Sequence, residues 1–205
     1  MKILKFPTVI VAPSYAFWRL VTLIVAWKNY RLRAFGTENV PRKGPVIIAA
    51  NHISWLDPPL VGAYCPRRIV YMAKRELFEI PWLGMLIATM GAFPVDREGN
   101  ARAAIKHSLE ILKAGGCLGI FPEGGRNVEG DRQAQTGVAL LASLSGAPVV
   151  PVAVIGSERA KEHPHIRVVY GKPLALPAGR KATREDLARF TDEIMAAVAH
   201  LRATA

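Results

Sequence analysis

The stretch "PVIIAANHISWLDPP", residues 45–59, decides the fold of this chain. Residues 45–50 are apolar throughout, which is typical of a short strand that helices cover on both faces of its sheet. Pro58 and Pro59 follow after a loop, and proline is favoured in the first turn of a helix. A buried strand that leads through a loop into a helix is the building unit of an α/β fold.

The same alternation of short apolar runs and helical stretches continues along the chain. We predict strands over residues 31–35, 45–50, 68–73, 92–95, 117–122, 149–155 and 166–171, and helices over 82–90, 100–114, 136–145 and from Thr183 onward. The pattern predicts an α/β, single-domain sandwich over residues 35–205, with a central mixed, largely parallel sheet flanked by helices. Pro151 lies within the run 149–155 and indicates an edge strand or a bulge, because proline has no N–H to donate.

The charge of the chain narrows the choice of partners. Its 27 Lys and Arg residues exceed its 16 Asp and Glu residues, which gives a net charge of +11. Such an excess favours an anionic partner: nucleic acid, a phospholipid surface or a phosphorylated small molecule. No RNA- or DNA-binding motif is visible, so we expect no nucleic-acid partner.

The cysteines and histidines show no metal-ligand spacing. Cys65 and Cys117 form neither a ligand pair nor a disulfide framework, and His163-Pro164-His165 has no cysteine or acidic cluster beside it. We therefore expect no metal site. Two thiols without a disulfide framework also indicate a reducing, cytoplasmic compartment.

Residues 1–34 form a separate N-terminal segment in our interpretation. Its apolar runs, 6–18 and 20–27, are divided by Arg19, Pro13 breaks the first run, and neither run reaches the roughly 20 residues that a membrane span needs. We expect a short amphipathic helix in the membrane interface, with the basic residues that follow it on anionic lipid. The alternative is a helix that packs on the protein's own core.

His52 and Asp57, five positions apart, allow two interpretations. Histidine titrates near neutrality and can take the proton of an attacking alcohol, while a carboxylate on its other ring nitrogen fixes the required tautomer. The substrate's hydroxyl would then be the nucleophile. Alternatively, Asp57 before two prolines is an N-cap, and His52 belongs to an ordinary turn. The spacing alone does not choose between these interpretations.

Further polar and glycine residues follow the ends of other predicted strands. Because the carboxyl ends of parallel strands meet at one edge of a sheet, we predict that these residues share a substrate pocket with His52. They are Lys74, Asp96, Arg97, Glu123, Gly124, Gly125 and Arg126. In "FPEGGRN", residues 121–127, glycine N–H groups and a guanidinium suit a phosphate. The alternative is a glycine turn with a solvent-facing arginine.

Four stretches of the chain form an ordered set: "NHISWLDP" (51–58), "AKRELFEIPWLGMLIATMGAFPVDR" (73–97), "FPEGGRN" (121–127) and "VVPVAV" (149–154). In order and spacing they resemble the four motif blocks of the glycerolipid acyltransferase family, whose best-known members are the 1-acyl-sn-glycerol-3-phosphate (lysophosphatidate) acyltransferases. The resemblance implies that residues 35–205 are an acyltransferase catalytic domain, with His52 as the general base and Asp57 as its partner.

The resemblance also implies roles for the other predicted site residues. The third block, with Arg97, is expected to bind the glycerol phosphate of the acceptor, and Lys74 is a further basic contact. Glu123 holds either the loop or the acceptor glycerol. The family's third block commonly reads Phe-Pro-Glu-Gly-Thr-Arg-Ser, and this chain has Gly125 and Asn127 in place of the threonine and serine. This departure leaves the identity of the acceptor open.

The activity implied by the resemblance is transfer of a fatty acyl group from acyl-CoA or acyl-carrier protein to the free hydroxyl of a lysophospholipid. The expected acceptor is 1-acyl-sn-glycerol-3-phosphate, the product is phosphatidate, and no cofactor is needed. We expect a peripheral or monotopic protein on the cytoplasmic face of an anionic membrane. The alternatives are transfer to another lysolipid, to an acylated amino lipid or to water, and a non-catalytic basic module that binds membranes.

Overall fold

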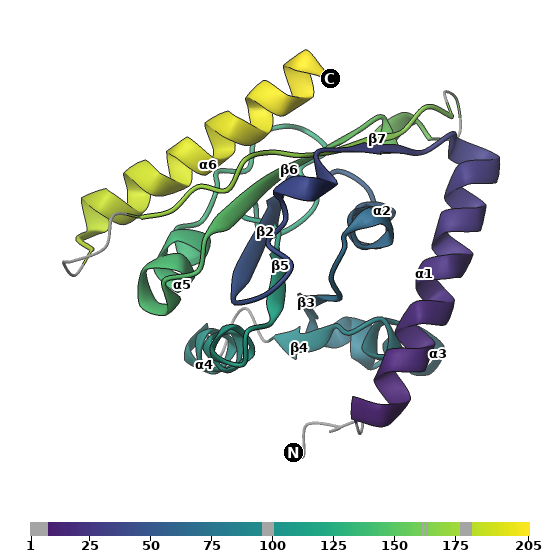
Figure 1. Cartoon of the computed structure of the whole chain (residues 1–205), viewed down its shortest axis with the longest axis horizontal. Helices are drawn as coiled ribbons and strands as arrows, with labels where there is room; N and C mark the ends of the chain where they lie inside the picture. Colours follow the sequence, from purple (N-terminus) through teal and green to yellow (C-terminus); the bar gives the residue numbers. More distant parts are fainter. Residues whose placement is uncertain (1–7, 96–100, 161, 163, 177–181) are drawn as a thin grey trace.

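The computed structural model describes residues 8–95, 101–160, 162, 164–176 and 182–205. Within these residues, seven strands form one sheet in the order β1-β7-β6-β2-β5-β3-β4 (Figure 1). The strands are β1 (Arg33–Phe35), β2 (Val46–Ala50), β3 (Ile69–Lys74), β4 (Phe93–Val95), β5 (Cys117–Ile120), β6 (Val149–Ile155) and β7 (Arg167–Tyr170). All seven lie where the sequence predicts strands.

The sheet is parallel except at one pair of strands. β6 and β7 run antiparallel, and the other neighbouring strands are parallel. At the centre, Ile48 of β2 lies in register with Gly119 of β5 and Val150 of β6. The prediction of a mixed, largely parallel sheet flanked by helices is therefore confirmed.

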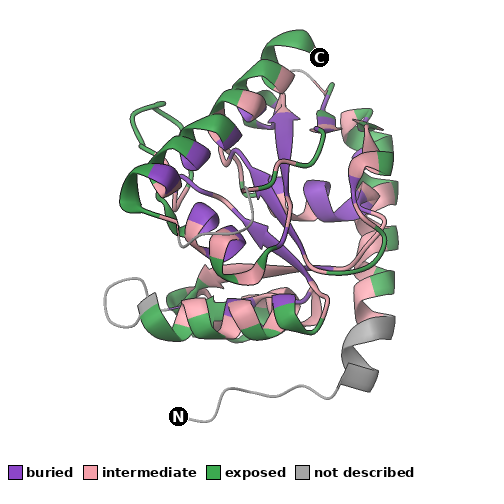
Figure 2. Ribbon diagram, turned by 60° about the vertical axis from the view of Figure 1, so that its left-hand side comes forward, coloured by how far each residue is buried: buried purple, intermediate pink, exposed green. Residues whose placement is uncertain are grey.

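Helices cover both faces of the sheet (Figures 1 and 2). They are α1 (Thr8–Tyr30), α2 (Asp57–Tyr64), α3 (Pro81–Thr89), α4 (Ala101–Lys113), α5 (Gly137–Ser145) and α6 (Arg184–Thr204). Alternate residues of β2 point to opposite faces: Ile48 packs with Leu60 of α2, whereas Ile47 packs with residues of α4, α5 and α6. β2 is fully buried for this reason, as its apolar sequence predicts.

Pro151 lies in an interior strand, so the expectation of an edge strand or a bulge is wrong. β6 has β2 on one side and β7 on the other, and Pro151 is in register with Ala49. The carbonyl of Pro151 accepts a hydrogen bond from the Gly171 N–H at 2.8 Å. Gly171 is the first residue after β7, so the missing proline N–H faces the end of the neighbouring strand, where little of the ladder is lost.

α1 is one continuous helix that passes through Pro13, so the prediction that this proline breaks the segment is wrong. A proline removes one N–H donor, and packing can outweigh that loss. One side of α1 lies against the domain: the Arg19 side chain donates to the Ala63 carbonyl at 2.8 Å, and the Tyr15 hydroxyl accepts from the Ile69 N–H at 3.3 Å. The packing alternative is thus observed for this side of the helix.

The opposite side of α1 is apolar and exposed. Its large side chains are Phe17, Leu20, Ile24, Val25 and Trp27. In the part of the chain that the structure describes, no helix is long and apolar enough to span a membrane. Whether residues 1–34 act as a separate segment stays a prediction.

Candidate active site

His52 and Asp57 meet in the loop between β2 and α2. The Nδ1 atom of His52 lies 3.1 Å from Oδ2 of Asp57. The same carboxylate oxygen accepts hydrogen bonds from the backbone N–H groups of Ile53 and Ser54, both at 2.7 Å. Asp57 is itself the first residue of α2, and its carboxylate bonds backward to the loop. The geometry therefore favours the dyad over the N-cap.

The carboxylate determines which ring nitrogen of His52 carries the proton. Oδ2 of Asp57 is an acceptor toward two N–H groups, so Nδ1 of His52 completes the set as a donor. The other nitrogen, Nε2, then has a free lone pair. Asp57 is fully buried while the His52 side chain is 15% exposed, so the ring can be reached by a substrate and its carboxylate partner cannot.

The peptide group of His52 is held from a second loop, residues 121–132. The His52 N–H donates to Glu123 Oε2 at 2.8 Å, and the His52 carbonyl accepts from the Asn127 N–H at 2.6 Å. The Asn127 side chain closes the ring, because its amide donates to the second oxygen of Glu123 at 2.8 Å. Glu123 and Asn127 thus fix the backbone that carries the imidazole.

Aromatic rings support the imidazole on one face. The His52 ring is stacked on Phe121 with 4.3 Å between ring centroids, and Phe121 is stacked on Tyr71 of β3 with 5.8 Å between centroids. Phe121 directly follows β5, so three neighbouring strands contribute to one stack at the carboxyl edge of the sheet. This arrangement leaves the imidazole few alternative orientations.

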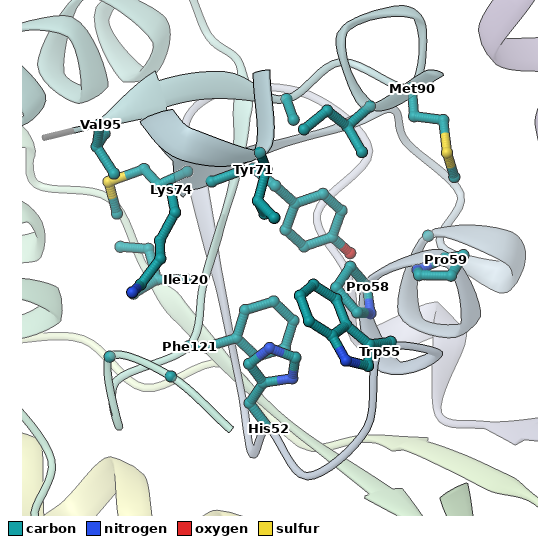
Figure 3. Close-up of a pocket in the computed structure, with 18 of the residues that line it drawn as sticks. His52, Trp55, Pro58, Pro59, Tyr71, Lys74, Met90, Val95, Ile120 and Phe121 are labelled. Carbon is teal, nitrogen blue, oxygen red and sulfur yellow. The ribbon is translucent and has the colours of Figure 1, made fainter. Parts of the chain in front are cut away.

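His52 opens into a large cavity of about 1040 Å³ (Figure 3). Near the imidazole the cavity is lined by Lys74, Gly124, Gly125 and Arg126. Farther away it is lined mainly by apolar side chains of α1, α2, α3, α4 and α5, among them Trp18, Pro59, Leu86, Ile105, Val138 and Leu141. A cavity lined by His52 and basic residues, and otherwise by mainly apolar walls, suits a molecule with an anionic head and a long apolar chain.

The Arg126 guanidinium is placed by an aromatic contact. Its Cζ atom lies 4.5 Å from the centre of the Trp55 ring, at a distance where a cation and a ring attract each other. Both side chains are exposed, Trp55 to 60%. Trp55 lies between His52 and Asp57 in the sequence, so the loop that carries His52 also supports the arginine.

The structure brings together five of the predicted substrate residues. Lys74, Gly124, Gly125 and Arg126 line the cavity, and Glu123 lies behind it with both carboxylate oxygens bonded to the protein. These contacts favour the loop-holding alternative for Glu123. Gly124 has a left-handed φ of +68°, where glycine is favoured. Asp96 and Arg97 lie outside the described residues, as does His163.

Four residues of the site were given no individual role from the sequence: Trp55, Tyr71, Phe121 and Asn127. Trp55, Phe121 and Asn127 lie within the motif blocks, and their spacing from His52 and Arg126 was the available signal. Tyr71 gave none, because an aromatic residue in a buried strand is ordinary core composition. Within the described ranges no three His, Cys, Asp or Glu residues cluster in a way that could hold a metal ion.

Comparison with known proteins places the chain in a family. The model of the family described as "Acyltransferase" matches residues 31–155. The chain belongs to the acyltransferase family. This result confirms the resemblance seen in the four sequence blocks, all of which lie in the matched range, and makes the chain an O-acyltransferase.

Individual members of the acyltransferase family are similar over most of the chain. The 1-acyl-sn-glycerol-3-phosphate acyltransferase of Bacillus subtilis is 34% identical over 80% of this chain and 84% of its own length. The protein of the same name from Streptococcus pneumoniae is 28% identical over 88% of this chain and 70% of its own length.

A solved structure shares the fold. The crystal structure of the 1-acyl-sn-glycerophosphate (LPA) acyltransferase PlsC from Thermotoga maritima matches with a TM-score of 0.71 at 24% identity, over 93% of this chain and 79% of that chain. The predicted acyltransferase-like architecture is thereby confirmed.

Proposed function

We propose that this acyltransferase transfers a fatty acyl group from a thioester, acyl-CoA or acyl-carrier protein, to the free hydroxyl of 1-acyl-sn-glycerol-3-phosphate, giving phosphatidate. The observation that carries the proposal is the His52–Asp57 pair facing a cavity that is basic near the imidazole and apolar beyond it. The names of the relatives that match most of the chain point to the same acceptor.

His52 acts as the general base in this proposal. Its Nε2 atom takes the proton of the acceptor hydroxyl while the hydroxyl oxygen attacks the thioester carbonyl carbon. The tetrahedral intermediate collapses, the C–S bond breaks, and the proton on Nε2 passes to the departing thiolate. Asp57 stabilises the imidazolium that exists between the two proton transfers, and no covalent acyl-protein intermediate is needed.

Arg126 binds the phosphate of the acceptor in this proposal. Its planar guanidinium can donate two parallel hydrogen bonds to phosphate oxygens, and Gly125, which has no side chain, lets the phosphate approach the backbone closely. The Gly124 N–H is already used, because it donates to the Phe121 carbonyl at 2.9 Å. Lys74, at the end of β3, adds a second positive charge on the cavity wall. Asp96 and Arg97 follow β4 in the sequence, and we assign them to the same substrate on the basis of the motif alone.

The contacts of Asn127 support an acceptor that is unchanged by the replacement of the family's serine. The residue that replaces the family's serine is bonded to Glu123 and to the Arg132 backbone. It thus serves the loop and leaves the phosphate to Arg126. Gly125, in place of threonine, exposes backbone where a hydroxyl would lie.

We further propose that α1 holds the protein on the cytoplasmic face of an anionic membrane as a peripheral or monotopic protein. The exposed apolar side of α1 would enter the interface, where a tryptophan such as Trp27 is favoured, and Lys28, Arg31 and Arg33 would contact anionic lipid. Flotation with vesicles tests this: Trp27→Ser and Leu20→Ser together should reduce binding, whereas His200→Ser on the exposed side of α6 should not.

One incubation tests the function. The purified protein is mixed with several lysolipids, acylated amino lipids, acyl-CoA and acyl-carrier protein donors, and the products are identified by mass spectrometry. We expect phosphatidate as the main product. The thiol that is released, CoA or acyl-carrier protein, identifies the class of donor. Acylation of another lipid would change the acceptor, thioester hydrolysis without lipid product would indicate a thioesterase, and no turnover at all would leave a membrane-binding module.

A further inference from the structure

Tyr71 lines the cavity and carries a hydroxyl that is unpartnered in the part of the chain that the structure describes. Its oxygen is buried, and among the described residues it makes no hydrogen bond. Buried polar atoms are rarely left in this state, because losing water without gaining a partner is unfavourable. The other side-chain atoms in the same situation belong to Asp57, Arg68 and Ser157, and none of these residues lines the cavity, whereas Tyr71 does.

Two other buried or half-buried tyrosines show how the protein satisfies a phenol elsewhere. The Tyr170 hydroxyl donates to the Val61 carbonyl at 2.5 Å, and the Tyr15 hydroxyl accepts from the Ile69 N–H at 3.3 Å. Tyr71 lacks such a contact although its ring is packed against Phe121. Among the described residues, the Tyr71 hydroxyl therefore makes no hydrogen bond that would stabilise the fold.

Gly62 of α2 leaves room for about one methyl group next to the Tyr71 hydroxyl. A β-carbon built on Gly62 would be 3.9 Å from this hydroxyl and 3.5 Å from that of Tyr15, and Gly62 itself lines the cavity. In Figure 3 the hydroxyl points toward Pro58 and Pro59, which belong to α2. Burial raises the pKa of Tyr71 well above its usual range, so the phenol is neutral and able to donate at physiological pH.

We infer that the Tyr71 hydroxyl is a substrate-binding group that donates a hydrogen bond to a carbonyl oxygen next to the fatty chain of a bound lipid. A carbonyl is the polar group that both substrates of the proposed function carry at the head of an otherwise apolar chain. In an apolar cavity it would lose its water on binding, and a neutral donor already in place offsets that loss. The inference rests on the proposed function, since that function supplies the lipids.

Two sources of this carbonyl are compatible with the position: the ester of the acceptor's chain and the thioester of the donor. Each has a matched analogue without the oxygen. The ether lipid 1-O-hexadecyl-sn-glycerol-3-phosphate replaces the acceptor ester, and S-hexadecyl-CoA replaces the thioester of palmitoyl-CoA. Dissociation constants for both pairs, measured by calorimetry with each ligand alone, separate the two sources without turnover.

The wild-type protein should bind one carbonyl-bearing ligand about fivefold more tightly than its analogue, the ratio expected for one net hydrogen bond. Tyr71→Phe should bring that ratio close to one while keeping the ring stack. Loss of the ratio for the ester pair assigns the acceptor, and loss for the thioester pair assigns the donor. Ratios in Tyr71→Phe equal to the wild-type ratios for both pairs overturn the inference.

Two further variants control for effects on the fold. Tyr71→Phe removes an unpartnered hydroxyl, so its melting temperature should equal or exceed that of the wild type, whereas Tyr170→Phe should melt lower and keep the ligand ratio. Gly62→Ala fits without close contacts and occupies the space beside the hydroxyl; it replaces Tyr71→Phe as the deciding variant if the latter does not fold. A wild-type protein that makes no phosphatidate contradicts the proposed function instead, whatever the ligand ratios are.

Discussion

The two sides of the cavity mouth are built differently. On one side the His52 ring, its peptide N–H and its peptide C=O are all bonded, and the carboxylate partner is fully buried. On the other side the Arg126 guanidinium is exposed and rests on one face of Trp55, which is itself 60% exposed. In the proposed function, the proton-transfer geometry is therefore fixed by the fold, whereas the proposed anion-binding group can adjust to its ligand.

This difference separates chemistry from recognition. A base must lie within hydrogen-bond reach of the attacking hydroxyl in the transition state, so rigidity there contributes to kcat. An arginine that only holds the headgroup contributes equally to bound substrate and transition state, so its loss appears in KM. Variants on the two sides of the mouth should therefore have different kinetic signatures.

The largest effect is expected for His52→Ala. Loss of a general base should reduce kcat by roughly 10²–10⁴-fold with little change in KM for the acceptor. Initial rates over a range of lysophosphatidate concentrations measure both constants, and circular dichroism checks the fold. His200→Ala is the matched control on α6 and should behave as the wild type. A His52→Ala protein with normal kcat would contradict the proposed role of His52 as the general base.

Asp57→Asn should have the next largest effect. The amide keeps the size of the side chain, but its NH₂ can turn toward Nδ1 and its charge no longer stabilises the imidazolium. We expect kcat to fall by roughly a hundredfold or more while the melting temperature changes little. A variant that loses its fold before its activity would show that the buried carboxylate serves mainly the loop.

Arg126→Ala should act on recognition. Removal of charge-assisted hydrogen bonds to phosphate should raise the KM for lysophosphatidate by about tenfold or more and leave kcat nearly unchanged. Arg126→Lys keeps the charge and loses the planar guanidinium, so its KM should lie between those of the wild type and Arg126→Ala. An equal loss of kcat and kcat/KM in Arg126→Ala would mean that the arginine acts in the transition state, and the proposed separation would be wrong.

Trp55→Leu should give a smaller change of the same kind. A cation–ring contact at an exposed position contributes about 0.5–1 kcal/mol, so KM should rise by roughly two- to fivefold. Combining Trp55→Leu with Arg126→Ala tests the contact, because the tryptophan should matter little once the guanidinium is gone. Effects that multiply in the double variant would show that Trp55 acts independently of Arg126.

Asn127→Ala should give the smallest decrease in kcat among the variants that are expected to lower kcat. It removes the amide that bonds Glu123, and kcat should fall by several-fold with KM preserved, because Glu123 holds the His52 peptide. Asn127→Ser, which can still donate to Glu123, should recover part of the loss. A change confined to KM would instead place Asn127 on the headgroup.

The sequence predicted the parts of the molecule that local patterns determine. β2 is apolar at every position, which predicted a buried strand, and the helix predicted from Thr183 onward begins with a capping box of Thr183 and Asp186. His52 and Asp57 emerged because they are only five positions apart, so that one loop can bring them into contact. Contacts between distant segments did not emerge: Tyr71 on Phe121, or Asn127 on the His52 carbonyl, depend on the order in which the strands pair.

Pro13 and Pro151 are two residues at which a local sequence rule gave the wrong prediction. Each was interpreted by its local rule, as a break in a helix and as a mark of an edge strand. In the structure, α1 runs through Pro13 and packs on α2 farther along, and β6 is interior because β7 ends beside the proline. Tertiary packing decides such cases, and a single sequence does not display it.

The tautomer of His52 tests the central claim most directly. The five histidines of the chain can be labelled with ¹⁵N, and the signals of His52 assigned by their absence in His52→Ala. At about pH 8, where an unperturbed histidine is neutral, nitrogen chemical shifts report which ring atom carries the proton. The structure predicts a protonated Nδ1 and a bare Nε2, with this preference lost in Asp57→Asn. A protonated Nε2 in the wild-type protein would contradict the assignment of His52 as the base.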